Sequence, residues 1–490
     1  MQPFQVDEGF TWQVTHNKLS VIYSTISHDS HPPLHNFVMR PLVRCTSSPF
    51  WLRLPELLVS LSVVYFCFLL GERAHSGWGI PSALLYACSY MVWMNNSQFR
   101  SYGFLDGGIW ATIYLLVRII DTDKGQGDIR RKDMFCLLFS AFVAASLHYI
   151  GTLAVLCLIF LLMVLPCCKQ LKHRAYLLAC LGLAVIPVMI WMAFALSQSN
   201  AMTTQSVNET NLSDLFFSIS SSCGLAHVHL MVRDVCAFLG LSSGVLARLP
   251  DIILWLLSAA LWLAVLRGAK ILWHTDRPLA YMLFFPYVLL CACLIISTLR
   301  HVMPIMNRHL LPLAPVLFIC LAAGMSAEQE RSNLCRYFCK SIFGVIVLFN
   351  LLNAAVFPFY QPLWRLSCQP AFDFIKTHSR GPGVILSYVP MSAFATMLNY
   401  GQGSITFDFA HQKIEYAEGY SGLEVMPLHP AFIGENCELL AGKQVFLMLM
   451  SYDPNTDAYL NSVSERYGVA DSLFVPNYWG SYTVYRLVAR

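Results

Sequence analysis

The chain has 490 residues, of which 56% are hydrophobic and only 12% are charged, and its mean hydropathy is +0.55. Soluble domains carry about 25% charged residues, and a single hydrophobic core stops growing beyond about 250–300 residues. Lipid must therefore solvate much of this chain, which excludes a cytosolic enzyme, a disordered protein and a fibrous repeat. The net charge is +4 without a basic block that would bind a phosphate backbone, so nucleic acid is excluded as a partner.

Residues 1–50 are polar and aromatic, with no signal peptide and no hydrophobic N-terminal helix. Two prolines disfavour helix at His31, and Pro33 suits the first turn of an amphipathic helix over 34–43. We predict that residues 1–50 form a first extracytoplasmic loop with amphipathic helices.

Residues 51–360 carry ten apolar segments that are candidates for crossing about 30 Å of hydrocarbon. The predicted spans are 53–72, 78–95, 104–120, 134–148, 150–166, 176–196, 250–267, 279–299, 309–324 and 340–358. The run 134–166 is too long for one ordinary helix and is interrupted at His148, so we predict two short helices that meet there.

The distribution of basic residues supports this division. Cytoplasmic loops of membrane proteins carry an excess of Lys and Arg, and four connectors can all face the cytoplasm only if 134–166 crosses twice. These basic connectors are 121–133, 167–175, 267–277 and 325–340. Residues 1–50 and the tail 361–490 are then predicted to lie on the outer side.

The tail 361–490 is predicted to be a small soluble extracytoplasmic α/β domain. Helical patterns cover 371–379, 391–400 and 455–467; strand patterns cover 383–388 and 444–450, and 481–488 alternates like an edge strand. The predicted fold is therefore an all-α polytopic membrane bundle with a small α/β C-terminal domain.

Ionisable groups near a bilayer are costly and are candidates for function. On the predicted outer side they gather at a few helix ends and loops: Asp7 and Glu8; His28, Asp29, His31 and His35; Arg100 and Asp106; His148; and Arg300, His301, Arg308 and His309. An ion channel would need charges near mid-span, where this sequence is nearly all apolar. The pattern therefore predicts a site at the outer membrane–water boundary.

Four motifs occur in order at predicted outer boundaries. They are Asp7-Glu8 with Asp29-Ser30-His31-Pro32-Pro33-Leu34-His35; Ser97-Gln98-Phe99-Arg100-Ser101-Tyr102; His148-Tyr149-Ile150-Gly151; and Asn307-Arg308-His309-Leu310-Leu311-Pro312-Leu313-Ala314-Pro315. Together they resemble the polytopic GT-C type glycosyltransferases that use lipid-linked sugars, the group of the dolichyl-phosphate-mannose protein mannosyltransferases and the bacterial aminoarabinose transferase. The resemblance covers roughly residues 5–325, with His309 where the family usually has Tyr. Family members begin with a transmembrane helix before the acid pair, and we expect this helix to be missing here.

The resemblance implies that Asp7 is the catalytic carboxylate, with Glu8 sharing its role or orienting a water or a metal. A departing lipid phosphate needs cationic or donor groups, and guanidinium suits phosphate better than ammonium does. We therefore expect Arg100 and Arg308, with His31 and Tyr102, to bind the donor phosphate. The structural alternatives are a solvated acid at Asp7 and arginines that snorkel to the interface.

Asp106, His148 and Tyr149 are expected to support this site. Asp106 resembles a second acid that some family members carry, and its alternative is a pairing with Arg100 under two helical turns away. The alternative for the histidines is a satisfied structural role. No cofactor is certain, and a divalent cation held by Asp7, Asp106 or His31 stays open.

The expected function is transfer of a hexosyl or pentosyl group from a polyprenyl phosphate to an extracytoplasmic glycan, lipid or protein, with inversion at the anomeric carbon. The expected location is a membrane, the bacterial inner membrane in particular. One alternative is a lipid or polysaccharide transporter, which would need broken or charged mid-span helices and an internal repeat. The other alternative is a catalytically inactive membrane scaffold.

Overall fold

The computed structural model describes most of the helical part and fragments of the C-terminal sheet. The described residues are 6–26, 31–46, 48–198, 223, 249–299, 307–325, 333–364, 369–379, 383–387, 405–408, 413–416, 423–427, 440, 442–450, 460–461, 466–475 and 482–489.

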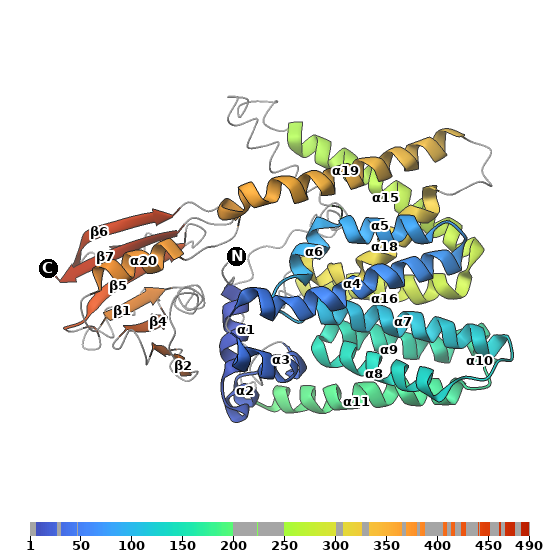
Figure 1. Ribbon diagram of the computed structural model, residues 1–490, viewed down its shortest axis with the longest axis horizontal. Coiled ribbons are helices and arrows are strands. Elements are labelled where there is room, and N and C mark those ends of the chain that lie inside the picture. The colour runs from blue at the N-terminus through green and yellow to red at the C-terminus, as the bar shows by residue number, and fades with distance from the viewer. Residues whose placement is uncertain are drawn as a thin grey trace. The chain divides into compact units, whose positions relative to one another are not determined.

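The chain divides into two compact units. One consists of residues 1–25, 39–52 and 356–490, and the other of residues 26–38 and 53–355. The domain limits predicted after residues 50 and 360 stay a prediction. The second unit is the helical bundle, and the sheet belongs to the first unit (Figure 1).

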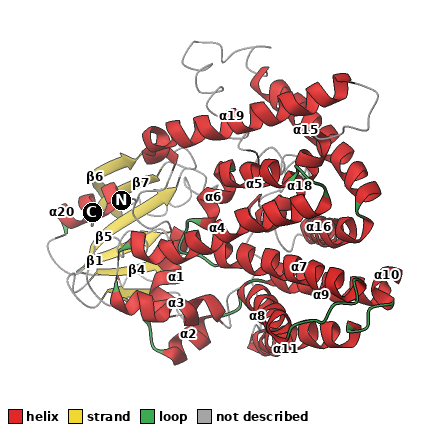
Figure 2. Ribbon diagram, turned by 45° about the vertical axis from the view of Figure 1, so that its right-hand side comes forward, coloured by secondary structure: helices red, strands yellow, loops and turns green. Residues whose placement is uncertain are grey.

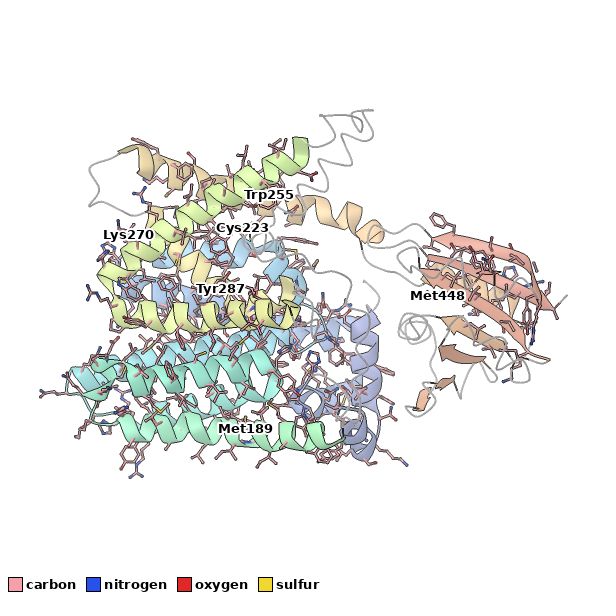
Figure 3. The ribbon with its side chains drawn as sticks, turned by 180° about the vertical axis from the view of Figure 1, so that it is seen from behind. Met189, Cys223, Trp255, Lys270, Tyr287 and Met448 are labelled. Carbon is pink, nitrogen blue, oxygen red and sulfur yellow. The ribbon has the colours of Figure 1, made fainter. Side chains whose placement is uncertain are left out.

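The bundle confirms the predicted all-α polytopic architecture, since six helices within the described residues are long and apolar enough to cross a membrane. These are α4 (Pro49–Ala74), α7 (Tyr102–Lys124), α11 (Arg174–Gln198), α15 (Leu249–Thr275), α16 (Arg277–Leu299) and α19 (Asn333–Trp364). Shorter helices complete it: α5 (Gly79–Cys88), α6 (Tyr90–Asn96), α8 (Arg131–Leu147), α9 (Tyr149–Val164), α10 (Pro166–Lys169), α17 (Asn307–Leu310), the 3-10 helix η2 (Leu311–Leu313) and α18 (Ala314–Met325). Met189 on α11 and Trp255 on α15 lie on outward faces of the bundle (Figure 3), as expected for side chains in lipid.

The predicted division of 134–166 is confirmed. Helix α8 ends at Leu147 and α9 begins at Tyr149, with His148 extended between them. The His148 ring accepts a 3.1 Å hydrogen bond from the amide of Ile150 and so caps α9. A Cβ on Gly151 would overlap the carbonyl of Ala144, so glycine allows this hairpin to close.

The prediction of one span over 78–95 is wrong. Ser89 is extended and separates α5 from α6. The amide of Tyr90 at this break donates instead to the side chain of Asn350 on α19, at 2.9 Å. A buried side-chain acceptor thus replaces a helical carbonyl. The predicted span 309–324 also begins irregularly, with α17 and η2 before α18.

Ion pairs join several connectors at one end of the bundle. Arg73 pairs with Asp121, with an NH2–Oδ1 distance of 2.7 Å, and also with Asp276. His173 Nδ1 lies 2.6 Å from Asp123 Oδ1. The ends of α4 and α7 and the starts of α11 and α16 therefore meet at the same end, as the distribution of basic connectors requires. Which side of a membrane this end faces stays a prediction.

Three short helices precede the bundle: α1 (Val6–His16), α2 (Leu19–Ile26) and α3 (Leu34–Cys45). The turn between α1 and α2 is tied to α3, since the Arg40 guanidinium donates to the carbonyl of Asn17 at 3.2 Å. One face of α3 is buried, at His35, Met39 and Val43, and the opposite face, which carries Arg44, is exposed. The amphipathic helix predicted over 34–43 is confirmed.

The tail contains a seven-stranded mixed sheet with the strand order β2-β3-β4-β1-β5-β7-β6 (Figure 2). The strands are β1 (Gly383–Ser387), β2 (Ile405–Asp408), β3 (Lys413–Tyr416), β4 (Leu423–Pro427), β5 (Gln444–Met450), β6 (Tyr467–Val475) and β7 (Tyr482–Ala489). Strands β4, β1 and β5 are parallel, and the other pairs are antiparallel. Helix α20 (Gln369–His378) packs beside β6 and β7.

The predicted α/β tail is thus confirmed, with one correction. The segment 481–488 is no edge strand: β7 lies between β5 and β6, and β6 forms the edge. The alternation of residue types in the sequence suggests an edge strand, but β7 pairs with a strand on each side. The helix predicted at 391–400 lies outside the described residues, as does most of the one at 455–467.

Candidate functional site

The end of the bundle opposite the ion pairs holds a buried acid–histidine pair. Glu56, near the start of α4, and His35 on α3 are both buried, and Oε1 of Glu56 lies 2.7 Å from Nε2 of His35. Burial, together with the positive charge of Arg100 and the ring of His31, lowers the pKa of His35 to about 3. The imidazole of His35 is therefore neutral at physiological pH.

The second oxygen of Glu56 caps helix α7. Glu56 Oε2 accepts a 2.8 Å hydrogen bond from the amide of Phe104, in the first turn of α7, and a further one from the amide of Gly103. Ser101, the N-cap residue, makes no side-chain hydrogen bond to the helix. Glu56 thus satisfies amides that the local sequence leaves unpaired.

The loop between α6 and α7 carries Arg100 beside this pair. Phe99 is fully buried and Arg100 is half-buried, and the amide of Arg100 donates to the carbonyl of Gln98 at 2.8 Å. The ring of His35 lies 5.4 Å from that of Phe99 and 6.1 Å from that of Phe104, on either side of Arg100 in sequence. The loop is therefore held in a tight turn with its arginine partly accessible.

Aromatic and imidazole rings gather at the α8–α9 junction. His148 lies 4.8 Å from His31, 6.0 Å from Tyr102 and 6.4 Å from His309, measured between ring centroids. Because Nδ1 of His148 accepts from a backbone amide, its proton resides on Nε2. Each of the four predicted motifs thus contributes a ring at this junction: His31, Tyr102, His148 and His309.

Asp106 lies one turn into α7 and belongs to a buried polar network. Its Oδ2 atom accepts from Tyr86 Oη at 2.9 Å and from Asn96 Nδ2 at 2.5 Å. Ser60 Oγ completes the network at 3.0 Å from Asn96 Nδ2. No cation pairs with Asp106 among the residues that the structure describes, so these neutral partners take the place of the alternative pairing with Arg100.

The predicted site residues divide into two sets. The structure brings His31, Tyr102 and His148 together, and the charge of Arg100 acts on His35. Asp106 belongs to its own network with Tyr86 and Asn96, and Tyr149 begins α9 directly after His148. Asp7 and Arg308 lie in α1 and α17, but their side chains fall outside the description. Glu8 is fully buried in α1.

Sequence reasoning missed Glu56, Tyr86 and Asn96. Glu56 carried a usable signal, because it is an acid within the apolar run 54–70, where a carboxylate is expensive. Tyr86 and Asn96 carried none, since their role depends on meeting Asp106 in space.

No group of three His, Cys, Asp or Glu side chains is disposed to hold a metal ion within the described part of the chain. Asp106 and His31, two of the residues considered for a divalent cation, therefore belong to no such cluster there. The third, Asp7, has no described side chain.

Comparison with known proteins places the fold. No protein-family model and no curated protein sequence matches the chain. The chain is similar to the crystal structure of ArnT from Cupriavidus metallidurans in the apo state, with a TM-score of 0.55 and 11% identity over 98% of this chain and 93% of that chain. The crystal structure of the same ArnT bound to undecaprenyl phosphate is similar with a TM-score of 0.51 and 11% identity, again over 98% of this chain and 93% of that chain. The chain therefore has a GT-C-like polytopic fold, as the sequence motifs predict.

Proposed function

We propose that this protein is a membrane glycosyltransferase that moves a sugar from a polyprenyl-phosphate donor to an extracytoplasmic acceptor. The observation that carries the proposal is the likeness to ArnT over 98% of the chain, because one of the similar ArnT structures is bound to undecaprenyl phosphate. The cluster of Arg100, His31 and His148 supports it, since cationic and donor groups at one end of a bundle suit a lipid phosphate.

In the proposed reaction an acceptor hydroxyl attacks the anomeric carbon of the donor sugar. The new bond joins the hydroxyl oxygen to that carbon, and the hydroxyl proton passes to the carboxylate of Asp7. The bond from the anomeric carbon to the phosphate oxygen breaks, and its electron pair leaves with the polyprenyl phosphate. Attack from the side opposite the leaving group inverts the anomeric centre.

The arginines stabilise the charge that develops on the departing phosphate. Arg100 and Arg308 are proposed to bind its oxygens, with His31 and Tyr102 as further donors. Glu8 is fully buried, which supports an orienting role for it rather than contact with substrate.

Asp106, Tyr149 and His148 are proposed to support the phosphate-binding groups rather than to react. Asp106 is buried and bonded to neutral groups, and His148 is fixed by its cap on α9. This scheme does not require a divalent cation, so we expect transfer in the first experiment to continue when EDTA is added.

The first experiment measures transfer from radiolabelled undecaprenyl-phosphate hexoses and pentoses by membranes that contain the protein. We expect Asp7→Asn to lower turnover at least a hundredfold, the usual contribution of a general base. The control is Asp128→Asn, an exposed acid in the connector after α7. Turnover of Asp7→Asn equal to that of wild type removes Asp7 from the role of base.

A second experiment tests the proposed acceptor, the sugar and the inner-membrane location. We expect a deletion strain to lose one sugar from a cell-envelope glycan, lipid or protein, detected by mass spectrometry of the envelope fraction. The mass lost identifies a hexose or a pentose. Tight lipid binding with no transfer to any acceptor would favour a transporter or an inactive scaffold instead.

A further inference from the structure

Glu56 connects the two segments that flank the Arg100 loop. Its Oε1 atom bonds to His35 at 2.7 Å, and its Oε2 atom accepts from the amide of Phe104 at 2.8 Å. His35 in turn packs against Phe99, the residue before Arg100. The loop is thus held from one side through His35 and from the other through the first turn of α7.

The contact between Glu56 and α7 is unusually close. A Cβ on Gly103 would lie 2.8 Å from Oε2 of Glu56 and 2.6 Å from its carbonyl oxygen, which only glycine permits. Because Ser101 gives no side-chain cap, the start of α7 depends on a residue 48 positions earlier in the chain. A change at Glu56 must therefore move or loosen the Arg100 loop.

We propose that Glu56 is a positioning residue for the donor phosphate: it holds His35 against Phe99, caps α7, and so fixes Arg100 where a lipid phosphate binds. This inference rests on the proposed function, in which Arg100 contacts that phosphate. Glu56 itself touches no substrate and acts through His35 and the first turn of α7.

The test compares the binding of undecaprenyl phosphate with that of the uncharged undecaprenol in detergent micelles. A misplaced Arg100 weakens only the charged lipid, whereas general loosening of the bundle weakens both lipids alike. We expect Glu56→Leu to bind undecaprenyl phosphate about tenfold more weakly, with binding of undecaprenol unchanged. Glu56→Gln retains an acceptor for Phe104 and a polar partner for His35, so we expect it to stay within about threefold of wild type.

Helix α4 offers a matched control at its other end. Glu72 accepts from the amides of Gly77 at 3.1 Å and Gly79 at 3.3 Å, which is the same kind of backbone cap. Glu72→Leu removes that cap near α5, far from the Arg100 loop along α4. We expect it to leave the preference for the charged lipid unchanged.

A double substitution tests the route through His35. Each of the variants Glu56→Leu and His35→Leu is expected to lower the preference for undecaprenyl phosphate by some factor. If Glu56 acts partly by holding His35, the double variant lowers this preference by less than the product of the two single factors.

Two results overturn the proposal: an unchanged preference in Glu56→Leu, or an equal loss in Glu72→Leu. A wild-type protein that shows no preference for undecaprenyl phosphate over undecaprenol refutes the proposed phosphate site itself, which is a different outcome.

Discussion

The indole of Trp110 on α7 donates a 2.9 Å hydrogen bond from Nε1 to the carbonyl of Pro312, which lies 202 residues later in η2. Trp110 is fully buried, and Pro312 follows Arg308 and His309 by one turn. Helix α7 begins at Tyr102, two residues after Arg100, so this bond ties together the two segments that carry the proposed phosphate-binding arginines.

We therefore expect Trp110→Phe to destabilise the protein and to weaken binding of undecaprenyl phosphate. The phenyl ring keeps most of the bulk, but the buried carbonyl of Pro312 loses its donor, at a cost of about 1–3 kcal/mol. Trp78→Phe is the control, because the Trp78 indole is equally buried and its Nε1 has no partner among the described residues. Equal loss of thermal stability in both variants would show that the hydrogen bond contributes nothing.

Folding stability should fall in mild acid because of His35. Its pKa is about 3 in the folded protein and near 6.5 when unfolded. Between these pH values the unfolded chain binds a proton that the folded chain does not. The contribution of His35 to the free energy of unfolding is therefore fully present above pH 6.5 and is lost as the pH drops toward 3, by at most about 1.4 kcal/mol per pH unit.

The measurement is thermal unfolding in detergent at pH 7.5, 6.5 and 5.5 for wild type and His35→Asn. Asparagine can still bond to Glu56 but does not titrate, so we expect its unfolding temperature to change less over this range. Parallel pH profiles for the two proteins would contradict the assignment.

Gly151 should not tolerate a side chain. Its added Cβ would overlap the carbonyl of Ala144 in the α8–α9 hairpin, and Gly151→Ala must therefore push the two helices apart. We expect a loss of about 1–3 kcal/mol, typical of overpacking, together with a displaced His148 and weaker phosphate binding. Gly182→Ala in α11 is the control, since its Cβ would meet nothing within 4 Å; there alanine should be neutral or stabilising.

The predicted sidedness can be tested with reporter fusions in a bacterial host. Arg73, Asp121 and Asp276 place the connectors after α4, α7 and α15 at one end of the bundle, predicted to be cytoplasmic. Fusions after Gly127 should give fluorescent GFP and inactive alkaline phosphatase. Fusions after Arg490 should give the reverse, and the same result at both positions would refute the topology.

Much of the fold could be predicted from sequence because lipid imposes simple constraints on it. The break at His148 was predictable, since a polar residue interrupts an apolar run that is too long for one helix. The break at Ser89 was not, because the apolar pattern continues through it and the compensating acceptor is Asn350, 261 positions away from Ser89 and 260 from the amide of Tyr90 that it binds.

The candidate site could be predicted only in part. The motifs indicated His31, Tyr102 and His148, whose rings do lie together, whereas Asp106 bonds to Tyr86 and Asn96 in a network of its own. Glu56 escaped notice because its function depends on partners 21 and 48 positions away, and spacing within α4 reveals neither. The strand β7 was misplaced for a related reason: alternation of side chains reports one covered face, not how many neighbouring strands pair with it.

Helix α18 has a consequence for how the protein responds to its surroundings. All twelve of its residues, Ala314–Met325, are buried, so protein and not acyl chains surrounds it on every side. A helix that is surrounded by protein need not match the bilayer in length and can be preceded by an irregular turn such as η2. A change in membrane thickness should therefore affect the peripheral helices such as α11 and α15. It should leave α18 in place, and with it the preceding helix α17, which carries His309.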